Sequence, residues 1–431
     1  MTERDRKRMD MRRRQFLARL GAVAGAAYLA PAFAQLGPAR ASDSFSSSDG
    51  GSYEGGGDSS SSSASAYSAP QRPRPPAPSR AREILISTRH PADLERLPAL
   101  GFEVRSRQTS ALLGVTLARI SPPARTSMDE AMRQLRQHLP DTQIAENTFY
   151  ETSELPCTDG SCSAFDLIGW QPRDLCDAAP VIGMIDTGIN PAHEALAGQN
   201  LTLITLDQGE RNLAGRVHGT AVATLLIGSA QSRTPGLLPK ARLVAAEAFF
   251  SDRVGEAADS FSVIRALEAL VEAGVSVINM SFAGPENLIL SQAIDAVAAR
   301  GIGLVAAAGN GGPAAPPAMP AAHPHVAAVT AVGRSLTVYR QAAAGSHIRL
   351  AAPGVQVWTA ASVSGGRFRS GTSYAAPFVT AAMAVAALEN PDTSPASLID
   401  GLAQAAMDLG APGRDDVFGW GLVQTASLCT A

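Results

Sequence analysis

Lysine is nearly absent from the sequence: only Lys7 and Lys240 occur among 431 residues. Schiff-base enzymes and Ser/Lys dyads require a lysine side chain, so this scarcity excludes most of that chemistry. An excess of positive charge is also missing, because residues 35–431 contain 28 basic and 36 acidic side chains, a formal charge of 28 minus 36, or −8. Proteins that bind nucleic acid usually present a basic surface, so nucleic acid is not expected as a partner.

Long apolar runs are missing beyond the N-terminus, and no later segment is expected to span a membrane. The N-terminus itself has three arginines at 12–14, followed by an Ala/Gly-rich apolar stretch that ends in the small-residue motif at 32–34. This pattern is typical of a twin-arginine export signal, which we predict at residues 1–34. The protein is therefore expected to be exported from a bacterium, periplasmic or secreted, with membrane attachment only if the signal is retained.

Cysteines are few, and none has the CxxC spacing of a zinc site. An even number of cysteines in an exported chain predicts two disulfides, for which three pairings are open. We favour the pairing of Cys157 with Cys162 across a short turn. Cys176 would then join Cys429 near the end of the chain.

Residues 35–82 are rich first in Ser and Gly and then in Pro and Arg, which predicts a disordered linker. The next segment, residues 83–155, alternates strand and helix patterns in the order βαββαβ, typical of a small ferredoxin-like α+β domain. Its strands are predicted at 83–88, 102–107, 112–120 and 142–150, and its helices at 91–100 and 127–138.

Residues 156–431 combine short, unalternated apolar runs with helical periods between them. Such runs predict strands buried on both faces, and hence an α/β domain with a mostly parallel sheet covered by helices. The strands are expected at 181–185, 201–206, 243–250, 275–282, 303–308, 325–332 and 348–352, and the helices at 219–227, 257–273, 288–299, 373–388 and 397–407.

Three polar residues stand where such a sheet collects functional groups, at strand ends and helix starts. Asp186 ends the first strand, and His218 and Ser373 each stand at a predicted helix start. Singly, each has an ordinary explanation as a turn former, a surface residue or an N-cap. Together they are the carboxylate, the general base and the nucleophile that acyl transfer through serine needs.

The chain order Asp, His, Ser excludes two other hydrolase classes. An α/β-hydrolase needs its histidine after its serine, and no histidine follows Ser373. An aspartic protease would need two Asp-Thr-Gly loops, and residues 186–188 are the only such triplet.

The motifs DTG at 186–188, HGT at 218–220 and GTSYAAP at 371–377 resemble those of the subtilisin-like serine proteases in order and spacing. The resemblance implies a three-layer subtilisin-like fold and a serine endopeptidase that acts on extended polypeptides. By position, Ser373 would be the nucleophile, His218 the general base, and Asp186 the carboxylate that orients the base.

Further site residues follow from the same resemblance. Asn310 would donate its side-chain amide to the oxyanion, with the backbone N–H of Ser373 as the second donor. The edge to which a substrate adds as a strand would be formed by Ser281, Phe282, Ala283 and Gly284.

Some positions depart from the family pattern. Tyr374 and Phe378 replace the usual Met and His, which alters the packing around the serine and the base. Calcium is often bound in this family, but residues 228–239 lack the Asp/Asn cluster of an oxygen-rich cage. We therefore expect no cofactor and no required metal, since structural calcium is not indicated.

The βαββαβ segment resembles the N-terminal prodomain with which these enzymes are commonly made. Such a prodomain assists folding and inhibits the active site until it is cleaved. Its last strand would then lie along the cleft, with self-cleavage near Tyr150, and a permanent accessory domain is the alternative. The expected partners are extended polypeptides and the chain's own prodomain, in a monomer. A catalytically silent peptide-binding pseudoprotease and a processing peptidase for one partner protein remain open.

Overall fold

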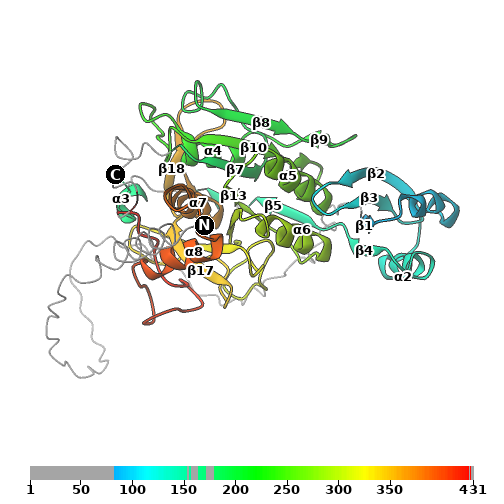
Figure 1. Cartoon of the computed structure of the whole chain (residues 1–431). Helices are drawn as coiled ribbons and strands as arrows, with labels where there is room; N and C mark the ends of the chain where they lie inside the picture. Colours follow the sequence, from blue (N-terminus) through cyan, green and yellow to red (C-terminus); the bar gives the residue numbers. More distant parts are fainter. Residues whose placement is uncertain (1–81, 153–154, 157–163, 171–178, 427, 429–431) are drawn as a thin grey trace, which may run out of the picture. The chain divides into compact units, whose positions relative to one another are not determined.

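The computed structural model describes residues 82–152, 155–156, 164–170, 179–426 and 428 (Figure 1). The predicted export signal, the predicted linker up to residue 81, and all four candidate disulfide cysteines (Cys157, Cys162, Cys176 and Cys429) lie outside these residues. Within the described part of the chain, no helix combines the length and the apolar character needed to cross a membrane.

The largest sheet has seven strands in the order β17-β16-β15-β13-β7-β10-β8, and every neighbouring pair is parallel. This confirms the predicted α/β class with a mostly parallel sheet. The strands are β7 (Val181–Asp186), β8 (Leu201–Thr205), β10 (Arg242–Glu247), β13 (Val277–Met280), β15 (Gly303–Ala307), β16 (Ala327–Val332) and β17 (Ile348–Pro353).

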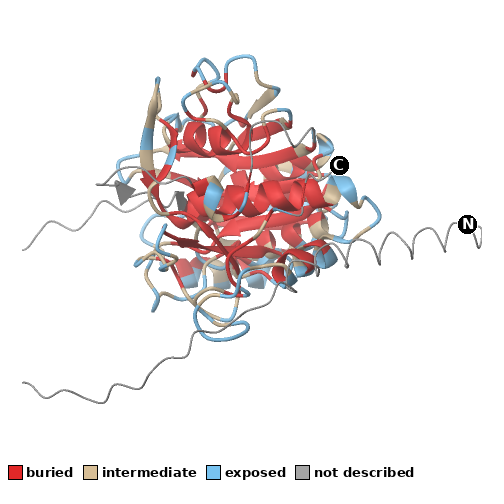
Figure 2. Cartoon of the chain, turned by 90° about the vertical axis from the view of Figure 1, so that its left-hand side faces the viewer, coloured by how far each residue is buried: buried red, intermediate tan, exposed pale blue. Residues whose placement is uncertain are grey.

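Helices cover both faces of this sheet. On β7, Ile182 and Met184 pack into the apolar cluster that contains α4 (His218–Ile227), α7 (Thr372–Glu389) and α8 (Pro395–Gln404). Ile185 points to the opposite face, into the cluster of α5 (Ser260–Glu272) and α6 (Leu288–Ala298). Because successive side chains alternate between two buried faces, these strands are mainly apolar. Figure 2 shows the buried residues concentrated in this sheet and its helices.

The N-terminal sheet is antiparallel, with strand order β2-β3-β1-β4. Its elements are β1 (Ile84–Thr88), β2 (Glu103–Ser110), β3 (Val115–Ser121), α2 (Met128–His138) and β4 (Gln143–Glu146), in agreement with the predicted βαββαβ order. The predicted helix at 91–100 is instead two 3₁₀ helices, Pro91–Arg96 and Pro98–Leu100. Pro98 cannot donate a backbone hydrogen bond, which explains the interruption.

Two elements differ from the sequence prediction where the N-terminal sheet meets the rest of the chain. The strand expected at 142–150 breaks at Asn147, and its second half forms β5 (Phe149–Thr152) between β12 (Glu256–Asp259) and β14 (Phe282–Ala283). The helix expected at 257–273 begins only at Ser260, because Asp259 is extended and its carboxylate accepts the N–H of Ser262 as an N-cap. The remaining short elements are α3 (Ala164–Leu167), β6 (Leu155–Pro156), β9 (Asn212–Leu213), β11 (Phe250–Ser251), β18 (Val357–Ala360) and β19 (Gly366–Ser370).

Candidate active site

Asp186 and His218 form a buried pair at one end of the large sheet. Asp186 is the last residue of β7 and His218 the first residue of α4, so the strand end and the helix start bring them together. His218 Nδ1 lies 2.7 Å from Asp186 Oδ1, and both side chains are at most 2% exposed. The same carboxylate oxygen accepts the N–H of Thr187 at 2.7 Å. This geometry fixes the imidazole ring and leaves Nε2 without a hydrogen-bond partner among the described residues.

Ser373 lies at the start of α7, which packs beside α4 in one apolar cluster. The ring of the next residue, Tyr374, lies 5.5 Å from the ring of His218, centroid to centroid. The starts of α4 and α7 therefore lie close to each other at this ring contact. Ser373 is buried, and its carbonyl oxygen accepts a hydrogen bond of 2.8 Å from Ser281 Oγ.

Asn310 is held beside the same helix start. Its side-chain oxygen accepts two hydrogen bonds from Thr372, one from the backbone N–H at 3.1 Å and one from Oγ1 at 3.0 Å. These bonds fix which way the amide faces. Its Nδ2 donor is buried and has no partner in the described part of the chain. Thr372, which sequence reasoning missed, thus orients an amide donor next to Ser373.

The predicted substrate edge is already paired with a strand of the same chain. On β14, Phe282 pairs with Thr152 and Ala283 with Glu151, while Ala258 on β12 pairs with Tyr150. The strand β5 is therefore paired antiparallel with β12 on one side and with β14 on the other. The sequence analysis named residues of β14 as a substrate edge but did not identify β12.

Tyr150 fills a closed space beside this edge. Its side chain is fully buried, with its ring 5.7 Å from the ring of Phe282 in an edge-to-face arrangement. A Cβ atom at Gly284 would lie 2.4 Å from Tyr150 Cδ1, so only glycine leaves room for this ring. Burial raises the pKa of Tyr150 to about 12. Its hydroxyl stays protonated and donates to the carbonyl of Pro285 at 3.3 Å.

A second strand pairing follows β5 a few residues later in the sequence. β6 (Leu155–Pro156) pairs antiparallel with β19, with Leu155 opposite Ser370 and Pro156 opposite Arg369. β19 ends three residues before Ser373. The strap, as we call residues 149–156, is thus paired at its first end with β12 and β14 and at its second end with β19.

No metal centre accompanies this arrangement in the described part of the chain. No group of three or more His, Cys, Asp or Glu side chains there is placed to hold a metal ion.

Comparison with known sequences places these residues in a known pattern. The sequence pattern of the subtilase family matches residues 177–421, more than half of the chain. Subtilisin DY of Bacillus licheniformis is 32% identical over 240 residues, which cover 53% of this chain and 84% of that protein. The minor extracellular protease Epr of Bacillus subtilis (strain 168) is 28% identical over 252 residues. That match covers 58% of this chain, but the chain spans only 38% of the length of Epr.

Solved structures show the same architecture. Fervidolysin from Fervidobacterium pennivorans, a keratinolytic enzyme related to subtilisin, matches with a TM-score of 0.67 over 81% of this chain and 61% of its own, at 19% identity. The patellamide maturation protease PatA matches with a TM-score of 0.51 over 57% of this chain and 94% of its own, at 26% identity. The former likeness shows the subtilisin-like fold. With the family pattern spanning the central sheet and its helices, the chain belongs to the subtilase family.

Proposed function

We propose that this chain is an exported serine endopeptidase in which Asp186, His218 and Ser373 act as the catalytic triad. The observation that carries the proposal is the buried pair of Asp186 and His218 beside the helix start that bears Ser373. The carboxylate holds Nδ1–H of the imidazole, which leaves Nε2 to accept the serine proton.

The reaction would follow the steps of acyl transfer. Ser373 Oγ attacks the carbonyl carbon of the scissile peptide bond while its proton passes to His218 Nε2. Asn310 Nδ2 and the backbone N–H of Ser373 donate to the oxyanion that forms. His218 then protonates the leaving amine, and a water molecule, deprotonated by His218, hydrolyses the acyl-enzyme and restores Ser373.

The first substrate would be the strap itself, which makes residues 83–155 an inhibitory prodomain. The register of β5 on β14 and of β6 on β19 leaves residues 153 and 154 between the two paired ends. We place the cut between Thr152 and Leu155, slightly beyond the position near Tyr150 that the sequence suggested. Until this bond is cut, the strap would exclude other substrates from the edge at residues 281–284.

A second candidate function differs from the first in the range of substrates that the enzyme would accept. PatA is named a patellamide maturation protease, and the structural match covers 94% of PatA. A processing peptidase for one partner protein is therefore the second candidate. A peptide library separates the two, because a general protease cleaves many sequences and a processing peptidase requires a long, strict consensus.

The decisive experiment is intact-mass spectrometry with a fluorophosphonate, comparing the wild-type chain with Ser373→Ala and with Ser335→Ala, an exposed serine, as the matched control. We expect one adduct and a cut between residues 152 and 155 in the wild type and the control, and neither in Ser373→Ala. Peptidase activity should fall in Ser373→Ala by a factor on the order of 10⁶, a size known for a subtilisin. A folded wild-type protein that forms no adduct although its cleft is free of residues 83–155 would contradict the enzyme and favour a peptide-binding pseudoprotease.

A further inference from the structure

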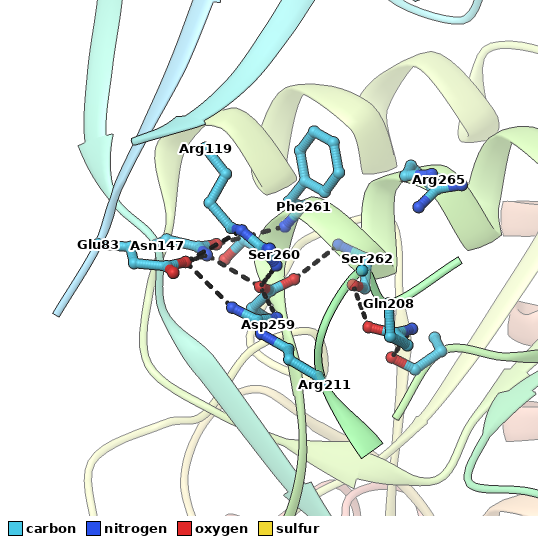
Figure 3. A network of polar contacts seen from close by, with 12 residues as sticks. Glu83, Arg119, Asn147, Gln208, Arg211, Asp259, Ser260, Phe261, Ser262 and Arg265 are labelled. Carbon is cyan, nitrogen blue, oxygen red and sulfur yellow. Dashed lines mark hydrogen bonds and ion pairs between the residues drawn. The ribbon is translucent and has the colours of Figure 1, made fainter. Parts of the chain in front are cut away.

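Four charged side chains form a closed ring where the N-terminal sheet meets the start of α5 (Figure 3). Arg211 contacts Asp259 Oδ2 at 2.5 Å through Nη1 and Glu83 Oε2 at 3.0 Å through Nη2. Arg119 contacts the same two oxygens, Asp259 Oδ2 at 3.1 Å through Nη1 and Glu83 Oε2 at 3.1 Å through Nε. Each acid therefore faces both arginines, and the signs alternate around the ring.

The ring is largely shielded from water. The four side chains are between 0% and 18% exposed. The guanidinium of Arg211 lies 4.2 Å from the ring centroid of Phe250, and that of Arg119 lies 6.0 Å from that of Phe261. In such surroundings a missing or reversed charge is far more costly than at an exposed surface, because no water replaces the lost partner.

Each side of the interface supplies one acid and one base. Glu83 immediately precedes β1 and Arg119 lies in β3 of the N-terminal sheet, whereas Arg211 and Asp259 belong to the segment that follows the strap. One contact of the ring lies within each side, and the other two cross the interface. If the two sides separate, each keeps one internal ion pair, so neither is left with a lone charge. A contact of this kind adds little net affinity but strongly disfavours a partner whose charges do not match.

The ring also sets where the strap begins. Asn147 Nδ2 donates to Glu83 at 3.2 Å and to Asp259 at 3.0 Å, and Asn147 stands two residues before the strap. Asp259 is the last residue of β12 and pairs there with Phe149, the first residue of the strap. A displacement of the Asp259 backbone in the ring would therefore change the register of the strap on β12.

We propose that this charge ring is the recognition element by which the peptidase part selects its own N-terminal domain and holds it reversibly after the strap is cut. This inference rests on the proposed function, because it requires self-cleavage. The partner is defined by its chemistry: an antiparallel sheet that presents a carboxylate at position 83 beside a guanidinium at position 119.

The test is a double-mutant cycle on the full chain after it has cut itself. Diluting the cut protein releases the N-terminal domain, so the concentration at which half of the peptidase activity appears measures its dissociation. Glu83→Gln and Arg211→Gln should each raise this concentration about tenfold or more, as for buried charge pairs across an interface. The double variant should show less than the product of the two effects, because both substitutions remove the same contact.

The matched control is Arg107→Gln, which removes an exposed ion pair with Glu95 inside the N-terminal domain. Its half-activation concentration should stay within twofold of the wild type. Singles that behave like this control, or effects that multiply in the double variant, would overturn the proposal. If a single variant fails to fold, Arg211→Lys takes its place. Lysine keeps the positive charge but cannot contact Glu83 and Asp259 through two fixed nitrogens, so the half-activation concentration should rise several-fold. An unchanged value for Arg211→Lys would also overturn it.

Failure of the proposed function gives a different result. In that case the wild-type chain itself shows no fluorophosphonate adduct and no cut. The ring would then belong to a permanent two-domain contact, and its role in selection after cleavage would fall as well.

Discussion

The two main sheets of the molecule share a pair of helices but differ in how they are covered. The large parallel sheet has α4, α7 and α8 on one face and α5 and α6 on the other, all from the same part of the chain. The N-terminal sheet has its own α2 on one face, whereas Leu85 and Leu117 on the other face join the cluster of α5 and α6. Figure 1 shows α5 and α6 beside this sheet.

This difference teaches that the two sheets depend on each other unequally. If the N-terminal sheet dissociates, the large sheet keeps the helices on both of its faces. Only the sides of α5 and α6 that contact the N-terminal sheet lose their partner. The N-terminal sheet would expose one apolar face, and burial of apolar surface is the main favourable term in folding. We therefore expect the N-terminal domain to be stable mainly while it is docked. If this domain is the removable inhibitor that we propose, its removal is favoured by this dependence.

Outside the proposed triad, the largest effect is expected from a substitution that lowers the reaction rate but leaves the folding of both sheets unchanged. Asn310→Ala should lower kcat on the order of 10²–10³-fold, a size borrowed from the same substitution type in a subtilisin. It should leave the unfolding temperature within a few degrees, because Asn310 bonds only Thr372 among the described side chains. Steady-state kinetics and thermal unfolding of each variant check this. A raised KM with unchanged kcat would show that the amide binds substrate in its ground state and not the oxyanion.

A matched pair of core substitutions tests the unequal dependence of the sheets. Leu225→Ala in α4 and Leu117→Ala in β3 both truncate fully buried leucines and should each cost about 2–5 kcal/mol. In the uncut Ser373→Ala chain, both should lower the denaturant midpoint. In the self-cut peptidase freed of its N-terminal domain, which no longer contains Leu117, only Leu225→Ala can do so. An unchanged midpoint for Leu117→Ala in the uncut chain would show that packing of the N-terminal sheet on α5 and α6 does not stabilise the whole chain.

The large sheet and the position of the candidate triad residues at its edge could be predicted from the sequence because local signals coincide there with the fold. Strands buried on both faces are apolar runs, and Asp186, His218 and Ser373 stand in short motifs at their ends. The predicted strands match β7, β15 and β17 closely, because burial on both faces determines most of these residues, whereas the strand predicted at 243–250 extends beyond the end of β10 at Glu247.

The contact between the sheets could not be predicted in the same way. Glu83, Arg119, Arg211 and Asp259 lie far apart in the sequence, and each alone has the pattern of an exposed charge. Residues 256–259, Glu-Ala-Ala-Asp, favour a helix by local propensity, yet they form β12 because β5 supplies a strand partner. The strand predicted at 142–150 was wrong for a related reason, since Asn147 leaves the sheet to bridge Glu83 and Asp259.

The smallest expected effect concerns the acid resistance of this contact. Burial alone would raise the pKa of Asp259, but Arg211 and Arg119 outweigh burial and lower that pKa to about 2. A carboxylate whose pKa is lowered on folding adds stability that is fully present above its unfolded pKa, near 4, and lost as the pH falls toward 2. In the uncut Ser373→Ala chain, Asp259→Asn should therefore cost about 2 kcal/mol at neutral pH, and the cost should shrink between pH 4 and pH 2.

Urea unfolding of both proteins across this pH range measures the difference, with Asp207→Asn as the control on an exposed carboxylate of the same region. Since Asp259 keeps its charge above pH 4, protonation of Asp259 should not open the ring in mild acid. Acid release of the N-terminal domain near pH 5 would require another titrating group. A cost of Asp259→Asn that is constant from pH 7 to pH 2 would show that the carboxylate acts by shape and hydrogen bonding, as the N-cap of α5, and not by its charge in the ring.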